Sequence, residues 1–227
     1  MVTYIFGPEW FYGIDTIFDM VSIVVSFMIA YFGYRCYKYS SQKRYLYFSS
    51  SFFLVALAFI IKIITTIPVY AREITQRTIG FLTITTTNYV RIVWIHRFGI
   101  FLARFLMISS FLMLFLLLMK IRNKKVIVLL FYFALITTLL SQYSYFVFHL
   151  TLALFLFYLS LGFRKNYLRT RLKNAGLVMC SFYVLFLSQL VFIFDLINKN
   201  CYVVGEVIQL VGYLILLFTL IRLYFKK

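Results

Sequence analysis

Residues 126–163 read VIVLLFYFALITTLLSQYSYFVFHLTLALFLFYLSLGF, a run of 38 residues without Asp, Glu, Lys or Arg. A helix of about 20 residues crosses a bilayer, so one helix of this length would be far too long. The polar patch Ser141-Gln142-Tyr143-Ser144 divides the run. We therefore predict two spans, at about 126–142 and 144–163, that form a tight helical hairpin.

Five further apolar stretches lie on either side of this hairpin, at about 14–34, 46–70, 94–119, 174–197 and 201–224. They are continuously apolar and lack the alternation of barrel strands. Before the first span, the chain lacks the basic segment of a cleaved signal peptide, so we expect that span to be an uncleaved anchor. The sequence predicts an all-α bundle of seven transmembrane helices, with residues 1–227 as a single integral membrane domain.

The overall composition agrees with this class. Of the 227 residues, 64% are hydrophobic and 13% are charged, and the mean hydropathy is +0.96. Soluble domains are typically about 45–50% apolar. These values exclude a water-soluble enzyme, and they equally exclude a disordered chain. Bulky Ile, Phe, Tyr and Lys usage is typical of an AT-rich, prokaryotic genome.

The net charge of +17 is distributed unevenly along the chain. Sixteen of the 23 basic residues follow the first, third, fifth or seventh span: Arg35, Lys38, Lys43, Arg44, Lys120, Arg122, Lys124, Lys125, Arg164, Lys165, Arg169, Arg171, Lys173, Arg222, Lys226 and Lys227. Positive loops remain in the cytoplasm, which predicts an outer N-terminus, an inner C-terminus and a multi-pass protein of the cell membrane. Anionic lipids of the inner leaflet account for the charge, so we expect no nucleic-acid partner.

The carboxylates show the opposite bias. All six fall on the predicted outer side or in the outer part of a span: Glu9, Asp15, Asp19, Glu73, Asp195 and Glu206. Two cations, Lys62 and Arg104, lie within spans, and Asp19 and Lys62 fall at similar depth, which predicts an ion pair. Charges in hydrocarbon are costly, so they are paired or face a wet cavity.

These positions predict an outward-facing polar pocket that suits an anion or a zwitterion. The candidate ligand-binding or ion-pair residues are Asp19, Lys62, Arg104, His149, Glu206, Gln209 and Tyr213, with Ser188 and Gln189 nearby on the sixth span. Four further candidates lie closer to the surface: Asp15, His96, Arg97 and Asp195. The alternative reading is purely structural, with ion pairs and side chains that extend to the interface.

Two smaller features concern organisation. Residues 71–93 are rich in Thr, Ile, Val and aromatics, which predicts a short outer β-hairpin over the pocket. Gly33-Tyr34-Arg35 and Ser51-Phe52-Phe53 are matched about 130 residues later by Gly162-Phe163-Arg164 and Ser181-Phe182-Tyr183. A parallel duplication of three helices joined by the fourth would explain this match, and chance similarity among membrane sequences is the alternative.

Catalytic and metal-binding motifs are missing. The chain has two histidines and no HExxH, GxSxG or CxxC, so we expect no enzymatic activity, no metal site and no cofactor. Cys36, Cys180 and Cys201 form no disulfide or zinc pattern.

Seven helices in this orientation resemble the topology of microbial rhodopsins and G-protein-coupled receptors. The seventh span lacks a lysine, so it cannot form the retinal Schiff base, and the receptor motifs E/DRY and NPxxY are absent. The layout of three, one and three helices is similar to SWEET-type sugar carriers, but the only prolines are Pro8 and Pro68. The segments 34–45 and 202–213 resemble the seven-helix input modules of prokaryotic membrane sensors.

Three functional hypotheses follow. The first is a sensor-like or ligand-binding, receptor-like component that acts through a protein partner in the membrane. The second is a small transporter or ion pathway, and the third is a structural subunit of a larger membrane complex.

Overall fold

The computed structural model describes residues 8–11, 13–78, 88–121 and 123–225. These residues form helices and contain no strand. The seven long helices are α1 (Ile14–Ser40), α2 (Lys43–Thr78), α3 (Asn88–Met119), α4 (Lys124–Ser141), α5 (Tyr145–Thr170), α6 (Lys173–Ile193) and α7 (Asn200–Phe225), with the short helices η1 (Glu9–Phe11) and η2 (Phe194–Leu196). All seven are long and apolar enough to cross a membrane, as the sequence predicted.

The division of the long apolar run is confirmed. Helix α4 ends at Ser141 and α5 begins at Tyr145. The turn between them is held by the backbone N–H of Ser144, which donates to the carbonyl of Leu140 at 3.3 Å. Ser144 itself is extended, with φ −138°, so the helix cannot continue through it.

Several helices run beyond the predicted spans. Helices α1 and α5 continue to Ser40 and Thr170, through segments rich in Tyr, Arg and Lys. Each then ends at a residue in the left-handed region, Ser41 (φ 54°) and Arg171 (φ 55°). Basic side chains near a helix C-terminus are favourable for the helix dipole, so the helix has no reason to stop where hydrocarbon ends.

The predicted outer hairpin receives no support. Residues 71–78 are the last turns of α2, and residues 88–93 are the first turns of α3. Residues 79–87, the remainder of the predicted hairpin, lie outside the described residues. Thr and Ile favour strands only weakly, and here helix propagation from two long apolar segments overrides that preference.

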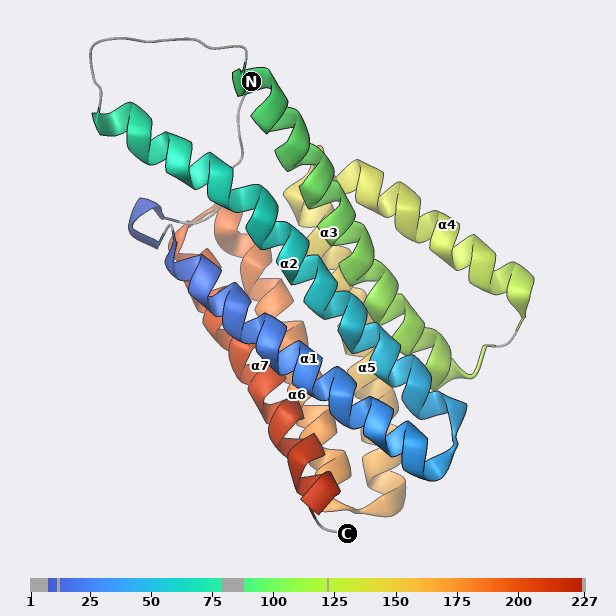
Figure 1. The fold of residues 1–227 in the computed structure, drawn as a ribbon. Helices are drawn as coiled ribbons and strands as arrows, with labels where there is room; N and C mark the ends of the chain where they lie inside the picture. Colours follow the sequence, from blue (N-terminus) through green and yellow to red (C-terminus); the bar gives the residue numbers. More distant parts are fainter. Residues whose placement is uncertain (1–7, 12, 79–87, 122, 226–227) are drawn as a thin grey trace.

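Six of the helices close into a ring, and α4 lies outside it (Figure 1). Helix α1 packs on α2 and α7, α2 on α3, α3 on α5, α5 on α6, and α6 on α7. Helix α4 contacts only the α3 and α5 side of the ring, so most of its surface is exposed. The ring therefore consists of two halves, α1–α3 and α5–α7, which meet at an α1/α7 seam and an α3/α5 seam.

The two halves bury equivalent positions. At the spacing of 130 residues seen in the sequence motifs, buried residues coincide in α1 and α5 and in α2 and α6: Ser22/Leu152, Ser26/Leu156, Ile29/Leu159, Ser51/Ser181, Phe52/Phe182, Val55/Leu185 and Phe59/Gln189. Because the spacing was fixed by the motifs and not by burial, this agreement supports a duplicated three-helix unit.

Candidate functional site

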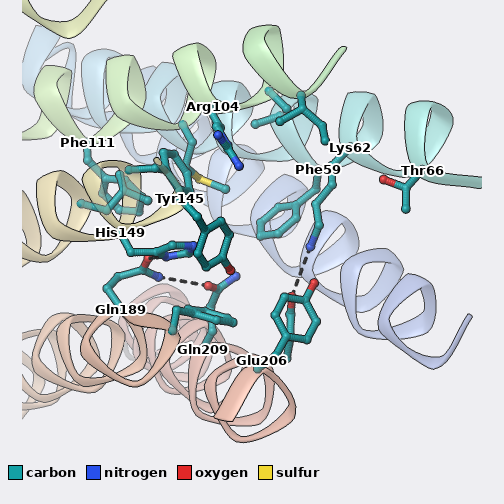
Figure 2. A pocket seen from close by; sticks show the side chains of 18 of the residues that line it. Phe59, Lys62, Thr66, Arg104, Phe111, Tyr145, His149, Gln189, Glu206 and Gln209 are labelled. Carbon is teal, nitrogen blue, oxygen red and sulfur yellow. Dashed lines mark hydrogen bonds and ion pairs between the residues drawn. The ribbon is translucent and has the colours of Figure 1, made fainter. Parts of the chain in front are cut away.

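A cavity of about 130 Å³ lies inside the ring, between α2, α3, α5, α6 and α7 (Figure 2). Its lining comes from the end of the bundle where α3, α5 and α7 begin and α2 and α6 end. The polar lining residues are Lys62, Thr66, His96, Arg104, Tyr145, His149, Gln189, Tyr202, Glu206, Gln209 and Tyr213, and the remainder are apolar and aromatic. A polar pocket enclosed by aromatic rings is typical of a small-molecule site.

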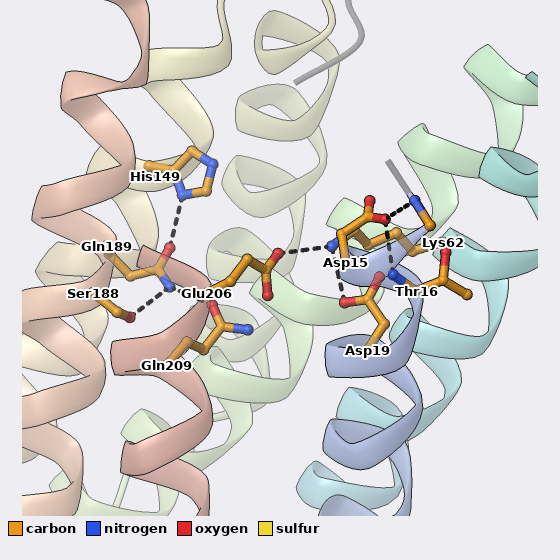
Figure 3. A network of polar contacts seen from close by, with 10 residues as sticks. Asp15, Thr16, Asp19, Lys62, His149, Ser188, Gln189, Glu206 and Gln209 are labelled. Atoms are coloured by element: carbon orange, nitrogen blue, oxygen red, sulfur yellow. Dashed lines mark hydrogen bonds and ion pairs between the residues drawn. The ribbon is translucent and has the colours of Figure 1, made fainter. Parts of the chain in front are cut away.

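An ion triad joins three helices at one wall of this cavity (Figure 3). Lys62 Nζ of α2 donates to Asp19 Oδ1 of α1 at 2.9 Å and to Glu206 Oε1 of α7 at 3.1 Å. Asp19 and Glu206 are buried, whereas the Lys62 side chain keeps 30% of its surface accessible. The expected Asp19–Lys62 contact is therefore present, with Glu206 as a second acceptor.

The triad contains two carboxylates and one ammonium group. Each charged side chain costs about 2.5–3.5 kcal/mol in a membrane interior, and direct pairing offsets part of that cost. With all three groups ionised, the triad carries one negative charge in excess. Glu206 lines the cavity, so part of this negative potential is directed into it.

Arg104 supplies the opposite charge from α3. Its guanidinium donates to the backbone carbonyl and to Oγ of Ser141, at the end of α4. It also lies 5.8 Å from the ring centroid of Tyr145 and 5.4 Å from that of Phe148. Among the described residues it forms no salt bridge with a carboxylate. Arg104 is thus a buried-side cation, held in place by neutral groups, that borders the cavity.

A neutral hydrogen-bonded chain crosses the opposite wall. His149 Nδ1 contacts Gln189 Oε1 at 2.8 Å, and Gln189 Nε2 donates to Gln209 Oε1 at 3.1 Å. An amide oxygen only accepts, so Nδ1 of His149 carries the proton. His149 Nε2 is buried without a hydrogen-bond partner, although the residue is only 5% exposed. This nitrogen is an unused acceptor at the cavity wall.

Two further candidates complete the pocket. His96 Nδ1 lies 2.8 Å from the carbonyl oxygen of Thr65, so it donates to the backbone of α2. Tyr213 is 2% exposed and meets the ring of Phe59 edge-on, with 6.1 Å between centroids. The structure therefore brings Lys62, Arg104, His96, His149, Glu206, Gln209 and Tyr213 to one cavity, with Asp19 directly behind Lys62.

Three predicted residues lie elsewhere. Asp15 accepts from the backbone N–H groups of Gly13 and Thr16 at 3.0 and 2.8 Å, so it stabilises the start of α1. Arg97 is exposed, although it lies one heptad before Arg104 on α3. Asp195 lies in η2 after α6 has ended, away from the cavity lining. Burial raises the pKa of Asp195 to about 6, partly opposed by Lys199.

Sequence reasoning missed the aromatic walls of the site. Tyr145, Tyr202, Phe148 and Phe192 line the cavity, and the rings of Tyr145, Phe148 and Phe192 surround His149 at 4.3–4.9 Å between centroids. The chain contains 28 Phe and 19 Tyr. With so many rings, no sequence signal distinguishes those that face a cavity from those that face lipid.

The described residues contain no group of three or more His, Cys, Asp or Glu side chains that could hold a metal ion. Comparison with known proteins returns no match among family models, curated proteins or solved structures. The functional proposal below therefore depends on the chemistry of the cavity itself.

Removal of the central ammonium group tests the triad. We predict that Lys62→Gln destabilises the protein by about 3 kcal/mol, because Asp19 and Glu206 remain buried without a counter-charge. The matched control is Lys165→Gln, an exposed lysine of α5, which leaves the midpoint of thermal unfolding in detergent unchanged. The triple variant Lys62→Gln/Asp19→Asn/Glu206→Gln recovers most of the loss. A triple variant that is no more stable than Lys62→Gln would contradict this account.

Proposed function

We propose that this protein is a non-enzymatic, receptor-like membrane protein that binds a small polar ligand in the cavity and acts through a partner in the membrane. The observation that carries the proposal is Arg104, a cation at the cavity with no carboxylate partner among the described residues. A stably folded apolar bundle gains nothing from such a charge, since desolvation is costly. A ligand that presents an anionic group offsets that cost.

The proposed orientation places the pocket on the outer face of a prokaryotic cell membrane. The opposite end of the bundle carries the exposed basic residues Lys38, Lys43, Arg44, Lys120, Lys124, Lys125, Arg164, Lys165, Arg169, Arg171 and Lys173. Such a distribution supports a cytoplasmic position for that end and contact with anionic lipids there.

Binding is favoured over conduction by the packing below the cavity. The apolar core includes Phe52, Ile108, Phe182 and Leu216, each fully buried. These side chains close the ring between the cavity and the basic end. A transport pathway would need a second arrangement of the two halves, whereas a binding site needs only the arrangement described.

The site also suggests how binding is transmitted. Lys62 and Glu206 meet across the α1/α7 seam, and Arg104 lies against Tyr145 and Phe148 across the α3/α5 seam. A ligand that engages these charges changes the contacts at both seams. The relative position of the two halves is then the bistable element through which a partner would detect the ligand.

Filling the cavity tests binding. Small acids, amines, zwitterions and neutral alcohols are screened for an increase in the unfolding temperature; ligand at a hundred times its Kd stabilises by about 2.7 kcal/mol. Ala103 lines the cavity, so Ala103→Leu is expected to abolish the response. Val128→Leu, at a 68% exposed position of α4, is expected to retain it. No response from any compound, or an equal response in Ala103→Leu, would count against the proposal.

Cysteine labelling tests the orientation. In a background with Cys36, Cys180 and Cys201 changed to Ser, single cysteines are placed at Tyr143, which is 89% exposed at the pocket end, and at Lys124, which is exposed at the basic end. A membrane-impermeant maleimide should label Tyr143→Cys in intact cells, and Lys124→Cys only after permeabilisation. The reverse pattern would place the pocket in the cytoplasm.

A further inference from the structure

We infer that the ligand is a small zwitterion, a free amine and carboxylate on one carbon framework with a compact apolar side chain, as in an α-amino acid. This inference rests on the proposed function and specifies the ligand class of the same cavity. Three independent properties of the pocket point to it: the separation of its charges, their sum, and the character and size of the space between them.

The carboxylate subsite is formed by Arg104. A guanidinium has five N–H donors in a planar fork that matches a carboxylate. In the structure one terminal nitrogen, Nη1, makes both hydrogen bonds to Ser141. The rings of Tyr145 and Phe148 pack against the group and fix its plane. The remaining donors are available to a ligand that enters the cavity.

The ammonium subsite is formed at the triad. Glu206 lines the cavity and shares Lys62 with Asp19, so the two carboxylates have one cation between them. Aromatic faces favour an ammonium group at such a position. Phe59 already lies 5.9 Å from Lys62 Nζ, and Tyr202 and Tyr213 line the same wall. A ligand ammonium group here supplies the missing positive charge.

The charge sum selects against ions of one sign. Lys62 and Arg104 carry two positive charges, and Asp19 and Glu206 carry two negative charges, so the pocket is neutral as a whole. A simple anion or cation would add a net charge to an apolar interior, which is costly. A zwitterion adds none, and its two ends match the two unbalanced subsites (Figure 2).

The space between the subsites sets the size and character of the side chain. A dry cavity of about 150 Å³ holds benzene, and this cavity is about 130 Å³. It is bordered by Ala58, Ile100, Met107 and Leu152. The free Nε2 of His149 is an additional acceptor for an ammonium hydrogen. Compact apolar side chains of the leucine or phenylalanine type fit these walls.

The test uses ligands that differ by one charged group. Leucine is compared with 4-methylpentanoate, which lacks the amine, and with 3-methylbutylamine, which lacks the carboxylate; phenylalanine, 3-phenylpropanoate and 2-phenylethylamine form a second series. Binding to the full chain in detergent is measured by calorimetry. We expect an amino acid to bind at least about tenfold more tightly than either partner compound, since a hydrogen bond to a charged group is worth that factor or more.

Variants assign each end of the ligand. In Arg104→Gln, loss of the carboxylate should no longer matter, so amino acid and amine bind equally. In Glu206→Gln, amino acid and acid bind equally. Arg97→Gln, an exposed arginine on the same helix, retains the wild-type differences.

Each other outcome overturns the zwitterion. If an acid binds as tightly as its amino acid, the ligand is a monoanion, and the proposed function survives with a different ligand class. If an amine binds as tightly, the ligand is a cation. If no member of either series binds at millimolar concentration, the zwitterion class is wrong, and the four-class screen with Ala103→Leu decides the proposed function separately.

Discussion

One ammonium group holds the polar end of this bundle together. Lys62 Nζ lies within 3.1 Å of both Asp19 and Glu206, and these three residues belong to α2, α1 and α7. In hydrocarbon an isolated charge of either sign is costly, so each member of the triad depends on the other two. The α1/α7 seam, the position of Glu206 at the cavity and the negative potential of that wall all follow from this contact.

The two halves of the ring share a buried face but differ in chemistry. At the common spacing of 130 residues, Asp19 corresponds to His149 and Lys62 corresponds to Phe192. The first half therefore carries charges where the second carries a neutral imidazole and a ring. This difference concentrates charge on one wall and leaves a neutral hydrogen-bonded chain on the other. An asymmetric pocket of this kind can orient an asymmetric ligand.

Hydropathy and charge predict most of the fold, because helix length in a bilayer depends on apolar run length alone. The split at Ser141–Ser144 and the Asp19–Lys62 contact follow from that reasoning, since depth along neighbouring helices fixes which residues can meet. Rotation about each helix axis is not encoded so simply. Arg97 and Arg104 occupy the same heptad position, yet one is exposed and the other borders the cavity. The ring positions of Tyr145 and Phe192 depend equally on helix rotation, and the abundance of aromatics hides them.

Exchange of the two charges that meet across the α1/α7 seam tests the central claim most directly. The midpoint of thermal unfolding is measured for Lys62→Glu, Glu206→Lys and the double variant. Each single change places like charges together and should cost about 3 kcal/mol or more. The double variant keeps one ammonium group between two carboxylates and should recover most of the loss. A double variant whose loss equals the sum of the two single losses would show that these residues do not interact, and would contradict the account.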